Sequence, residues 1–313
     1  MLRRLVISFF LFPLFLSAQE QDTTPLLKSL KLIYENDLFT NTDYYYTGGT
    51  FVEFDLPCLR KDPLSKALVK LPHGRNESYG ISINNLGFSP RSIKSDSILL
   101  GDRPFSATLY LGLNRVSCNT QKKIRLNSEL DLGVIGPSAL GYQEQKFIHT
   151  HTNNPIPHGW EFQIRNDVYI NYSVRLEKGL VAVKRFFDFT GYGFANAGTI
   201  YNNAGIGLTT RIGRMNNYFQ APGFSKRFQC WIFARGEGKL VAHDATLEGG
   251  FFNTRSIYVI PPENIKHSTF SFSAGIVFAY KKIHLEFYDT ALTPEFKDCW
   301  PHAWGHIGLE ILL

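Results

Sequence analysis

Hydrophobic and polar residues alternate one by one along most of the chain from about residue 104 onward. In segment 268–281, Phe270 and Phe272 fall on one face, and Thr269 and Ser271 fall on the other. Successive side chains of a β-strand point to opposite faces, so this period of two indicates strands rather than helices.

The pattern predicts about twelve strands, and an even number is typical of a single-chain bacterial barrel. We expect them near residues 29–38, 45–56, 77–87, 104–116, 122–135, 165–177, 180–190, 203–214, 227–238, 268–281, 282–292 and 303–313. Tight hairpins are predicted at Lys178-Gly179 and at Lys281-Lys282.

The composition of the two faces favours a membrane barrel over a soluble sandwich. The apolar face is unusually aromatic, in a chain with 14% aromatic and only 19% charged residues. The opposite face mixes charges of both signs with glycine and serine, as a polar lumen requires. We therefore predict an all-β fold, a closed antiparallel transmembrane β-barrel. A secreted β-sandwich is the alternative, and detergent-dependent solubility would separate the two.

The first residues have the pattern of an export signal. Arg3 and Arg4 precede an apolar run from Leu5 to Leu16, and the small residues Ser17-Ala18 follow. This run is too short for a membrane-spanning helix, which needs about 20 apolar residues. We expect residues 1–18 to be a signal peptide and residues 19–313 to form one outer-membrane barrel domain. The four widely spaced cysteines form no metal-binding pattern.

Polar residues that suit a hard cation lie where the first two predicted strands meet. Glu35-Asn36-Asp37 ends the first strand, and Thr47 lies in the second. If the strands pair as a hairpin, Asn36 or Asp37 can meet Thr47 across them. Their oxygens are ligands that calcium takes. The same residue types also make a plain polar turn, so the spacing leaves both interpretations open.

A second group contains Gln145 and His149, which are four residues apart and would share one face of a helical turn. A histidine fixed by a neighbour can act as a general base near neutral pH. His151 has no such support and is interpreted as an exposed loop residue.

Three cations, Arg91, Lys94 and Arg103, are candidates for binding an anionic head group of a substrate. The alternatives are an Asp102–Arg103 pair that organises a loop, and solvated loop charges at Arg91 and Lys94.

Three ordered blocks resemble the lipid A 3′-O-deacylase family of outer-membrane barrels. They are ENDLF…TDYYYTGG at 35–49, GDRPFSA at 101–107, and GPSALG…Q…H…GW…Q across 136–163. The resemblance is specific in the N-terminal half, whereas the C-terminal half matches only as barrel strands. It implies a calcium-dependent carboxylic ester hydrolase of the cell outer membrane, which removes the 3′-linked acyloxyacyl chain of lipid A.

The resemblance also implies roles for individual residues. The catalytic residues would be Asn36, Asp37, Thr47, Gln145 and His149, with calcium held near Asn36 and Asp37 and with His149 taking a proton from water. The expected partners are lipid A or lipopolysaccharide and outer-membrane lipid, with no nucleic acid, and we expect a monomer.

Two departures from the family pattern affect the expected activity. Tyr44 stands where the family usually has arginine, and Pro155 stands where an acidic residue of the active site is expected. The main alternative is a non-catalytic outer-membrane barrel that binds or transports a small solute. Convergence of Asn36, Thr47 and His149 on one site would distinguish the enzyme from that alternative. A Ser–His phospholipase is disfavoured because no serine is convincingly placed beside His149.

Overall fold

The computed structural model describes residues 27–40, 42, 44–72, 74, 76–219 and 225–313, and it contains one closed β-barrel. The expected signal peptide, residues 1–18, lies outside the described residues. The strands are β1 (Ser29–Asn36), β2 (Tyr45–Asp55), β3 (Asn76–Ser89), β4 (Ser106–Asn119), β5 (Ile124–Ile135), β6 (Asp167–Val183), β7 (Phe187–Gly198), β8 (Tyr201–Arg214), β9 (Ser225–Asp244), β10 (Ser268–Lys281), β11 (Ile283–Leu292) and β12 (His302–Leu312).

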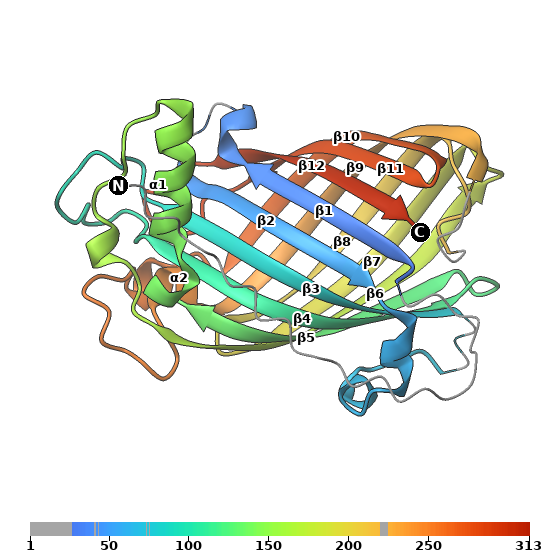
Figure 1. The fold of residues 1–313 in the computed structure, drawn as a ribbon, viewed down its shortest axis with the longest axis horizontal. Helices are drawn as coiled ribbons and strands as arrows, with labels where there is room; N and C mark the ends of the chain where they lie inside the picture. The colour runs from blue at the N-terminus through green and yellow to red at the C-terminus, as the bar shows by residue number, and fades with distance from the viewer. Residues whose placement is uncertain (1–26, 41, 43, 73, 75, 220–224) are drawn as a thin grey trace, which may run out of the picture.

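All neighbouring strands in the barrel pair antiparallel and in sequence order, and β1 closes the barrel against β12 (Figure 1). The closing register aligns Ser29 with Leu312 and Asn36 with Gly305. Closure leaves no free sheet edge, which a membrane-spanning sheet requires because lipid offers no hydrogen-bond partners. The predicted all-β antiparallel barrel is therefore confirmed.

The predicted strands agree with the observed ones to within a few residues, except at β6 and β7 and at the end of β9, which runs six residues beyond the predicted end at 238. The expected hairpin at Lys178-Gly179 is wrong: both residues lie within β6, and the chain turns after Val183. A bulge between Gly179 and Val181 shifts the register against β7. After such a bulge, the residues that faced inward face outward and the reverse. In the sequence, this break in the alternation of polar and apolar residues looks like the end of a strand. The hairpin at Lys281-Lys282 is confirmed by the end of β10 and the start of β11.

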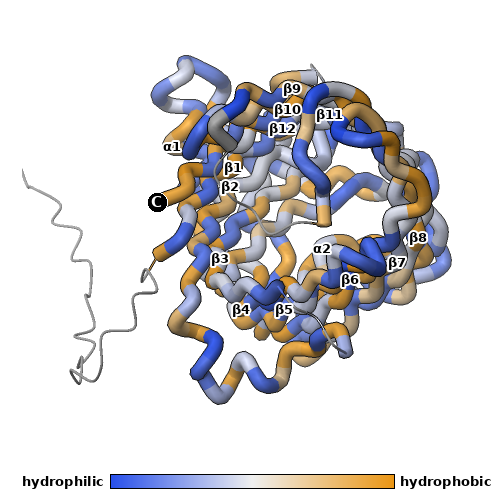
Figure 2. The backbone as a smooth tube through the Cα atoms, turned by 90° about the vertical axis from the view of Figure 1, so that its right-hand side faces the viewer, coloured by the Kyte–Doolittle hydropathy of each residue, from blue (hydrophilic) through white to orange (hydrophobic). Residues whose placement is uncertain are grey.

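Hydrophobic and hydrophilic residues alternate along the strands of the wall (Figure 2). On β10, Phe270 and Phe272 are exposed on the outside, whereas Thr269 and Ser273 are buried inside. An exposed apolar outer surface on a closed barrel is suited to lipid contact. Among the described residues, no helix is long and apolar enough to cross a membrane.

The two ends of the barrel differ in their connections. The turns at 120–123 and 184–186 lie at one end, together with the strand termini Ser29 and Leu312. The long connection between β2 and β3 also lies at this end. The opposite end has most of the long connections, including those that contain α1 (Gly141–Thr152) and α2 (Ala245–Glu248). Longer loops are typical of the extracellular end of such barrels. The short 3₁₀ helices are Asp37–Thr40, Pro57–Lys61, Leu64–Ala67, Pro137–Ala139, Trp160–Phe162 and Pro262–Asn264.

Packed side chains fill the extracellular end. One apolar cluster joins Tyr45, Leu247, Ile260 and Phe296, so the loops that follow β9 and β11 pack on the start of β2. A second cluster forms where Phe105, Ala107, Ala139 and Trp160 meet, which anchors the segment that leads into α1. This end of the barrel is therefore a rigid support for α1.

Candidate active site

Four of the predicted catalytic residues line one small pocket, of about 40 Å³, on the outside of the barrel wall beneath α1. Asn36 and Thr47 come from β1 and β2, and Gln145 and His149 come from α1. Figure 1 shows α1 lying across the ends of the neighbouring strands. The pocket is lined by Tyr34, Asn36, Thr47, Gly48, Gly49, Gly87, Gly141, Glu144, Gln145, Ile148, His149 and Trp160.

The β1–β2 side of the pocket is shaped by a bulge at Thr47. The pairing of β2 with β3 aligns Tyr46 with Phe88 and Gly48 with Gly87, so Thr47 is the extra residue. Bulges re-aim side chains and are common next to active sites. The Asn36 amide nitrogen donates to the Thr47 carbonyl oxygen over 2.7 Å, and the Thr47 hydroxyl donates to Ser89 Oγ over 2.7 Å. The predicted meeting of Asn36 with Thr47 is therefore confirmed.

His149 is held on the pocket side of α1 by a backbone carbonyl. Its Nδ1 lies 2.6 Å from the Pro155 carbonyl oxygen, and the side chain is about nine-tenths buried, with 9% exposed. A carbonyl oxygen can only accept, so Nδ1 carries the proton in neutral His149. This tautomer leaves Nε2 with a free lone pair, as a general base requires. The chain turns back toward His149 through Asn153, which has a left-handed φ of 56°.

Gln145 is oriented by Trp160. The indole Nε1 donates to Gln145 Oε1 over 2.7 Å. Because indole N–H groups only donate, the amide oxygen faces Trp160 and the amide NH₂ group is directed elsewhere. Gln145 and Trp160 both line the pocket and are almost fully buried. The site therefore has an amide donor beside His149.

Asp37 does not line the pocket with Asn36. It begins the 3₁₀ helix after β1 and is 3% exposed. Its carbonyl oxygen accepts a hydrogen bond from the Thr40 hydroxyl over 2.9 Å. The structure therefore places Asn36 at the pocket and Asp37 in the buried turn beside it.

Arg103 lies inside the extracellular end of the barrel and does not reach the pocket. Its guanidinium donates to Glu295 Oε2 over 2.7 Å and to Thr246 Oγ1 over 2.6 Å. Only 2% of Arg103 is exposed, and its guanidinium lies 4.3 Å from the centre of the Phe88 ring. Arg103 thus connects the start of β4 to α2 and to the β11–β12 loop, which is a structural position.

Arg91 and Lys94 are exposed on the loop between β3 and β4. The Arg91 guanidinium pairs with buried Asp102 at 3.2 Å. Burial lowers the pKa of Arg91, but the charge of Asp102 and its hydrogen bond outweigh burial and hold that pKa above the ordinary value. The loop is joined to the segment after α1, because His158 N–H donates to the Ile93 carbonyl oxygen over 2.7 Å. Both cations therefore lie at the outer end, on the same side of the barrel as α1.

The sequence reasoning missed Glu144 and Tyr34 and gave Trp160 no role of its own, and all three also line the pocket. Burial raises the pKa of the Glu144 carboxyl, and the Thr50 hydroxyl lies 3.5 Å from it. Glu144 precedes Gln145 on the helix. A search of the helical face that carries Gln145 and His149 would have found it if the adjacent residue had been included. Trp160 follows a glycine with φ of 94°, and this turn returns the chain beneath α1.

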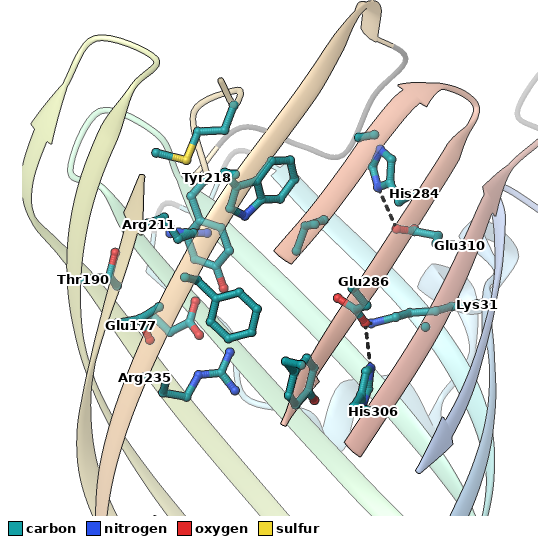
Figure 3. Close-up of a pocket in the computed structure, with 18 of the residues that line it drawn as sticks. Lys31, Glu177, Thr190, Arg211, Tyr218, Arg235, His284, Glu286, His306 and Glu310 are labelled. Carbon is teal, nitrogen blue, oxygen red and sulfur yellow. Dashed lines mark hydrogen bonds and ion pairs between the residues drawn. The ribbon is translucent and has the colours of Figure 1, made fainter. Parts of the chain in front are cut away.

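A larger cavity of about 820 Å³ occupies the lumen and is separate from the pocket. Figure 3 shows Lys31, Glu286 and His306 on one side of it, and Glu177 and Arg235 on the other. Lys31 Nζ lies 2.6 Å from Glu286 Oε1, which in turn contacts His306 Nε2 at 3.2 Å. Asn36, Thr47 and His149 do not line this cavity, so the predicted residues converge outside the wall rather than in a solute pathway.

A metal site made only of acidic, histidine or cysteine side chains is not present in the described part of the chain, where no three of these groups cluster. The pocket instead offers oxygens of mixed type, from Asn36, Thr47 and Glu144. Amide, hydroxyl and carboxylate oxygens are ligands suited to a hard cation.

The closed barrel and its apolar outer surface define an outer-membrane barrel, with a polar pocket on the outside of its wall. The chain belongs to the LpxR family of outer membrane proteins, whose family model matches residues 5–313. This is the lipid A 3′-O-deacylase family that its sequence blocks resemble, and the protein is located in the outer membrane.

One solved structure agrees with this assignment at the level of the fold. LpxR from Salmonella typhimurium has a TM-score of 0.71 and 20% identity, with 91% of this chain and 100% of that chain covered. The β domain of the Bordetella autotransporter BrkA has a TM-score of 0.44 and 10% identity, with 92% and 100% covered. A search of curated proteins found no match.

Replacing Trp160 by phenylalanine tests how Gln145 is oriented. Phenylalanine keeps an aromatic ring against Phe105, whose ring centre lies 4.8 Å from that of Trp160, but it removes the N–H donor. Losing one buried hydrogen bond leaves the amide free to turn, so we expect ester hydrolysis to fall roughly tenfold in kcat. Steady-state kinetics on detergent-solubilised protein would measure the change. An unchanged kcat would show that this hydrogen bond does not orient the amide for catalysis.

Proposed function

We propose that this protein hydrolyses the ester that links the 3′ acyloxyacyl chain to lipid A in the outer leaflet. The observation that most supports the proposal is the convergence of Asn36, Thr47, Gln145 and His149 on one pocket outside the wall. A lipid substrate can reach such a pocket by lateral diffusion, without leaving the membrane. The ester bond of lipid A lies near the boundary between acyl chains and sugars, where the extracellular end of the barrel is also located.

In the proposed reaction, His149 acts as the general base. Nε2 takes a proton from a water molecule as the water oxygen bonds to the acyl carbon. The bond from that carbon to the sugar oxygen then breaks, and the proton passes from His149 to the sugar oxygen. The Pro155 carbonyl, which lies 2.6 Å from Nδ1, accepts the Nδ1 hydrogen bond and fixes the ring, although it lacks the charge of the acidic residue expected at this position. Pro155 therefore leaves His149 with an orienting acceptor.

The amide NH₂ group of Gln145 is proposed to stabilise the negative charge on the acyl oxygen. Donors that are fixed before the reaction are effective because they need no reorganisation as the charge develops. The Trp160 hydrogen bond of 2.7 Å supplies this preorganisation. Asn36 and Thr47 would position the substrate on the strand side of the pocket. Arg91 and Lys94 are proposed to contact the phosphate groups of lipid A.

The test is mass spectrometry of lipid A from cells with and without this protein. The proposal predicts loss of the 3′ acyloxyacyl mass only in cells that make the protein, and release of the corresponding acid. Unchanged lipid A in an outer membrane that contains folded protein would contradict it.

Calcium is the cofactor that we propose for this site. Asn36 and Glu144 would hold it, with Asp37 adding negative charge from the adjacent turn, and these oxygens fit a hard cation. When bound, calcium would polarise the acyl carbonyl as a Lewis acid. Glu144 is the one carboxylate that lines the pocket among the described residues, so binding should be weak, because affinity rises with ligand charge.

We expect excess chelator to abolish hydrolysis and added calcium to restore it. Glu144→Gln should raise the calcium concentration needed, and Pro155→Glu should lower it by adding a carboxylate. Calcium-dependent resistance to thermal unfolding gives a second measurement that does not depend on activity. Full activity in excess chelator would remove the metal from the mechanism. A calcium requirement that Pro155→Glu leaves unchanged would show that residue 155 does not determine metal affinity.

A further inference from the structure

Gly87 lines the pocket, and packing does not explain why this position is a glycine. Four glycines line the pocket, and a Cβ would collide with neighbours at two of them and be tightly crowded at a third. At Gly141 it would meet Ala107 and Trp160, at Gly49 the Tyr46 hydroxyl, and at Gly48 the Glu35 carbonyl oxygen at 3.0 Å. A Cβ on Gly87 would meet no heavy atom within 4 Å.

The backbone does not require glycine at residue 87 either. Gly87 lies within β3, paired with Gly48 on one side and Ala107 on the other, and its φ is outside the left-handed region. Glycine inside a strand costs about 0.5–1 kcal/mol relative to alanine. Nearby on the same face, Ile83 is exposed to the membrane and Asn85 donates to the Ala139 carbonyl oxygen over 2.9 Å. Neither packing nor backbone conformation therefore requires glycine at residue 87.

The groups around this space differ in polarity on its two sides. Ile148 and Trp160 provide apolar surface, whereas Gln145 and His149 provide polar groups. Gln145 and His149 are only 6% and 9% exposed, and no hydrogen bond from His149 Nε2 to a described residue is seen. Buried polar side chains beside apolar surface in one pocket suit an ester joined to a hydrocarbon chain.

Building on the proposed function, we propose that Gly87 forms the floor of an acyl-chain subsite. The long-chain fatty acyl group next to the scissile ester lies against the bare wall at Gly87, beneath Ile148. The site is outside the barrel, so the rest of the chain stays in contact with lipid. Pulling a chain out of lipid into water costs about 0.8 kcal/mol for each CH₂ group, and this arrangement avoids that cost. Gly87 therefore determines which acyl chains fit.

The experiment compares Gly87→Leu with Gly238→Leu. Gly238 lies on β9 and pairs with the exposed residues Ile206 and Phe270, and a Cβ added to it would also meet no heavy atom within 4 Å. Both variants place a leucine on the outer wall, but only Gly87→Leu fills the pocket. Purified proteins are assayed on lipid A with a long 3′ chain and on lipid A whose 3′ chain has been shortened.

We expect Gly87→Leu to lower the long-to-short ratio of kcat/KM by about tenfold or more, since a few methylene groups in an apolar pocket are worth that much. Gly238→Leu should leave the ratio unchanged. If Gly87→Leu keeps the wild-type ratio of kcat/KM, the proposal is overturned, even if both values fall.

A second measurement separates this inference from the proposed function. A photoactivatable fatty acid is added in membranes, and crosslinks to the peptide that contains residues 76–89 are counted against those near Ile206. We expect these crosslinks in the wild type and in Gly238→Leu, and their loss in Gly87→Leu. If the wild type leaves lipid A intact but shows this crosslinking pattern, the hydrolase proposal fails and the acyl subsite stands. Equal crosslinking in all three proteins would contradict the subsite itself.

Discussion

Replacing His149 by alanine is expected to lower ester hydrolysis by roughly 10²- to 10⁴-fold, the usual contribution of a general base. The barrel should remain folded, because His149 lies on α1 outside the wall and its partner is the Pro155 carbonyl oxygen on the same loop. Release of fatty acid from lipid A measures the activity, and the shift in electrophoretic mobility on heating measures the fold.

His151→Ala is the matched control for this variant. His151 lies on the same helix, and its Nδ1 also contacts a carbonyl oxygen, that of Phe147, at 2.8 Å. It is exposed and does not line the pocket. Its replacement should change activity by less than about twofold, since it does not touch the reacting groups. Equal losses in the two variants would contradict the assignment of His149 as the base.

Arg103→Ala is expected to destabilise the barrel by about 3–5 kcal/mol, because it leaves the Glu295 carboxylate buried without its partner. The Arg103–Glu295 ion pair spans 2.7 Å and connects two loops at the extracellular end. Unfolding by urea in lipid vesicles would measure the loss. Lys28→Ala is the control, since the Lys28–Asp55 pair is longer, at 3.9 Å, and more exposed. It should cost about 1 kcal/mol or less.

The same ion pair predicts how stability depends on pH. Burial alone would raise the pKa of the Glu295 carboxyl, but the charge of Arg103 outweighs burial and holds that pKa below the ordinary value of 4.5. A carboxyl with a lowered pKa in the folded state stabilises the fold above its ordinary pKa and loses this effect as the pH falls below it. Wild-type stability should therefore fall below pH 4.5, and Glu295→Gln should flatten this dependence.

Kinetics of Arg103→Ala also separate two roles for this residue. If Arg103 bound the substrate head group, as the sequence suggested, its loss would raise KM and high substrate concentration would restore the rate. Because its guanidinium is buried against Glu295 and Thr246, we expect the folded fraction to keep its KM. A large rise in KM at full folding would contradict the structural role.

Local patterns in the sequence determined most of the fold. A strand alternates at every residue, so the twelve strands and their lipid-facing sides could be predicted without knowing which strands pair. The same local reasoning placed Gln145 and His149 on one helical face, because residues four apart are neighbours there. It failed where one residue breaks the phase, at the bulge near Gly179.

Contacts between distant segments were decided only by the tertiary structure. Closure of β1 on β12 and the bulge at Thr47 put the β1–β2 residues on the outside of the wall, beneath α1. The fold of the loop after α1 brought the Pro155 carbonyl to His149 and the Trp160 indole to Gln145. Packing of three loops buried Arg103 away from the pocket. Sequence periodicity specifies which way a side chain points from its own element, but partners depend on register and loop closure, which long-range packing sets.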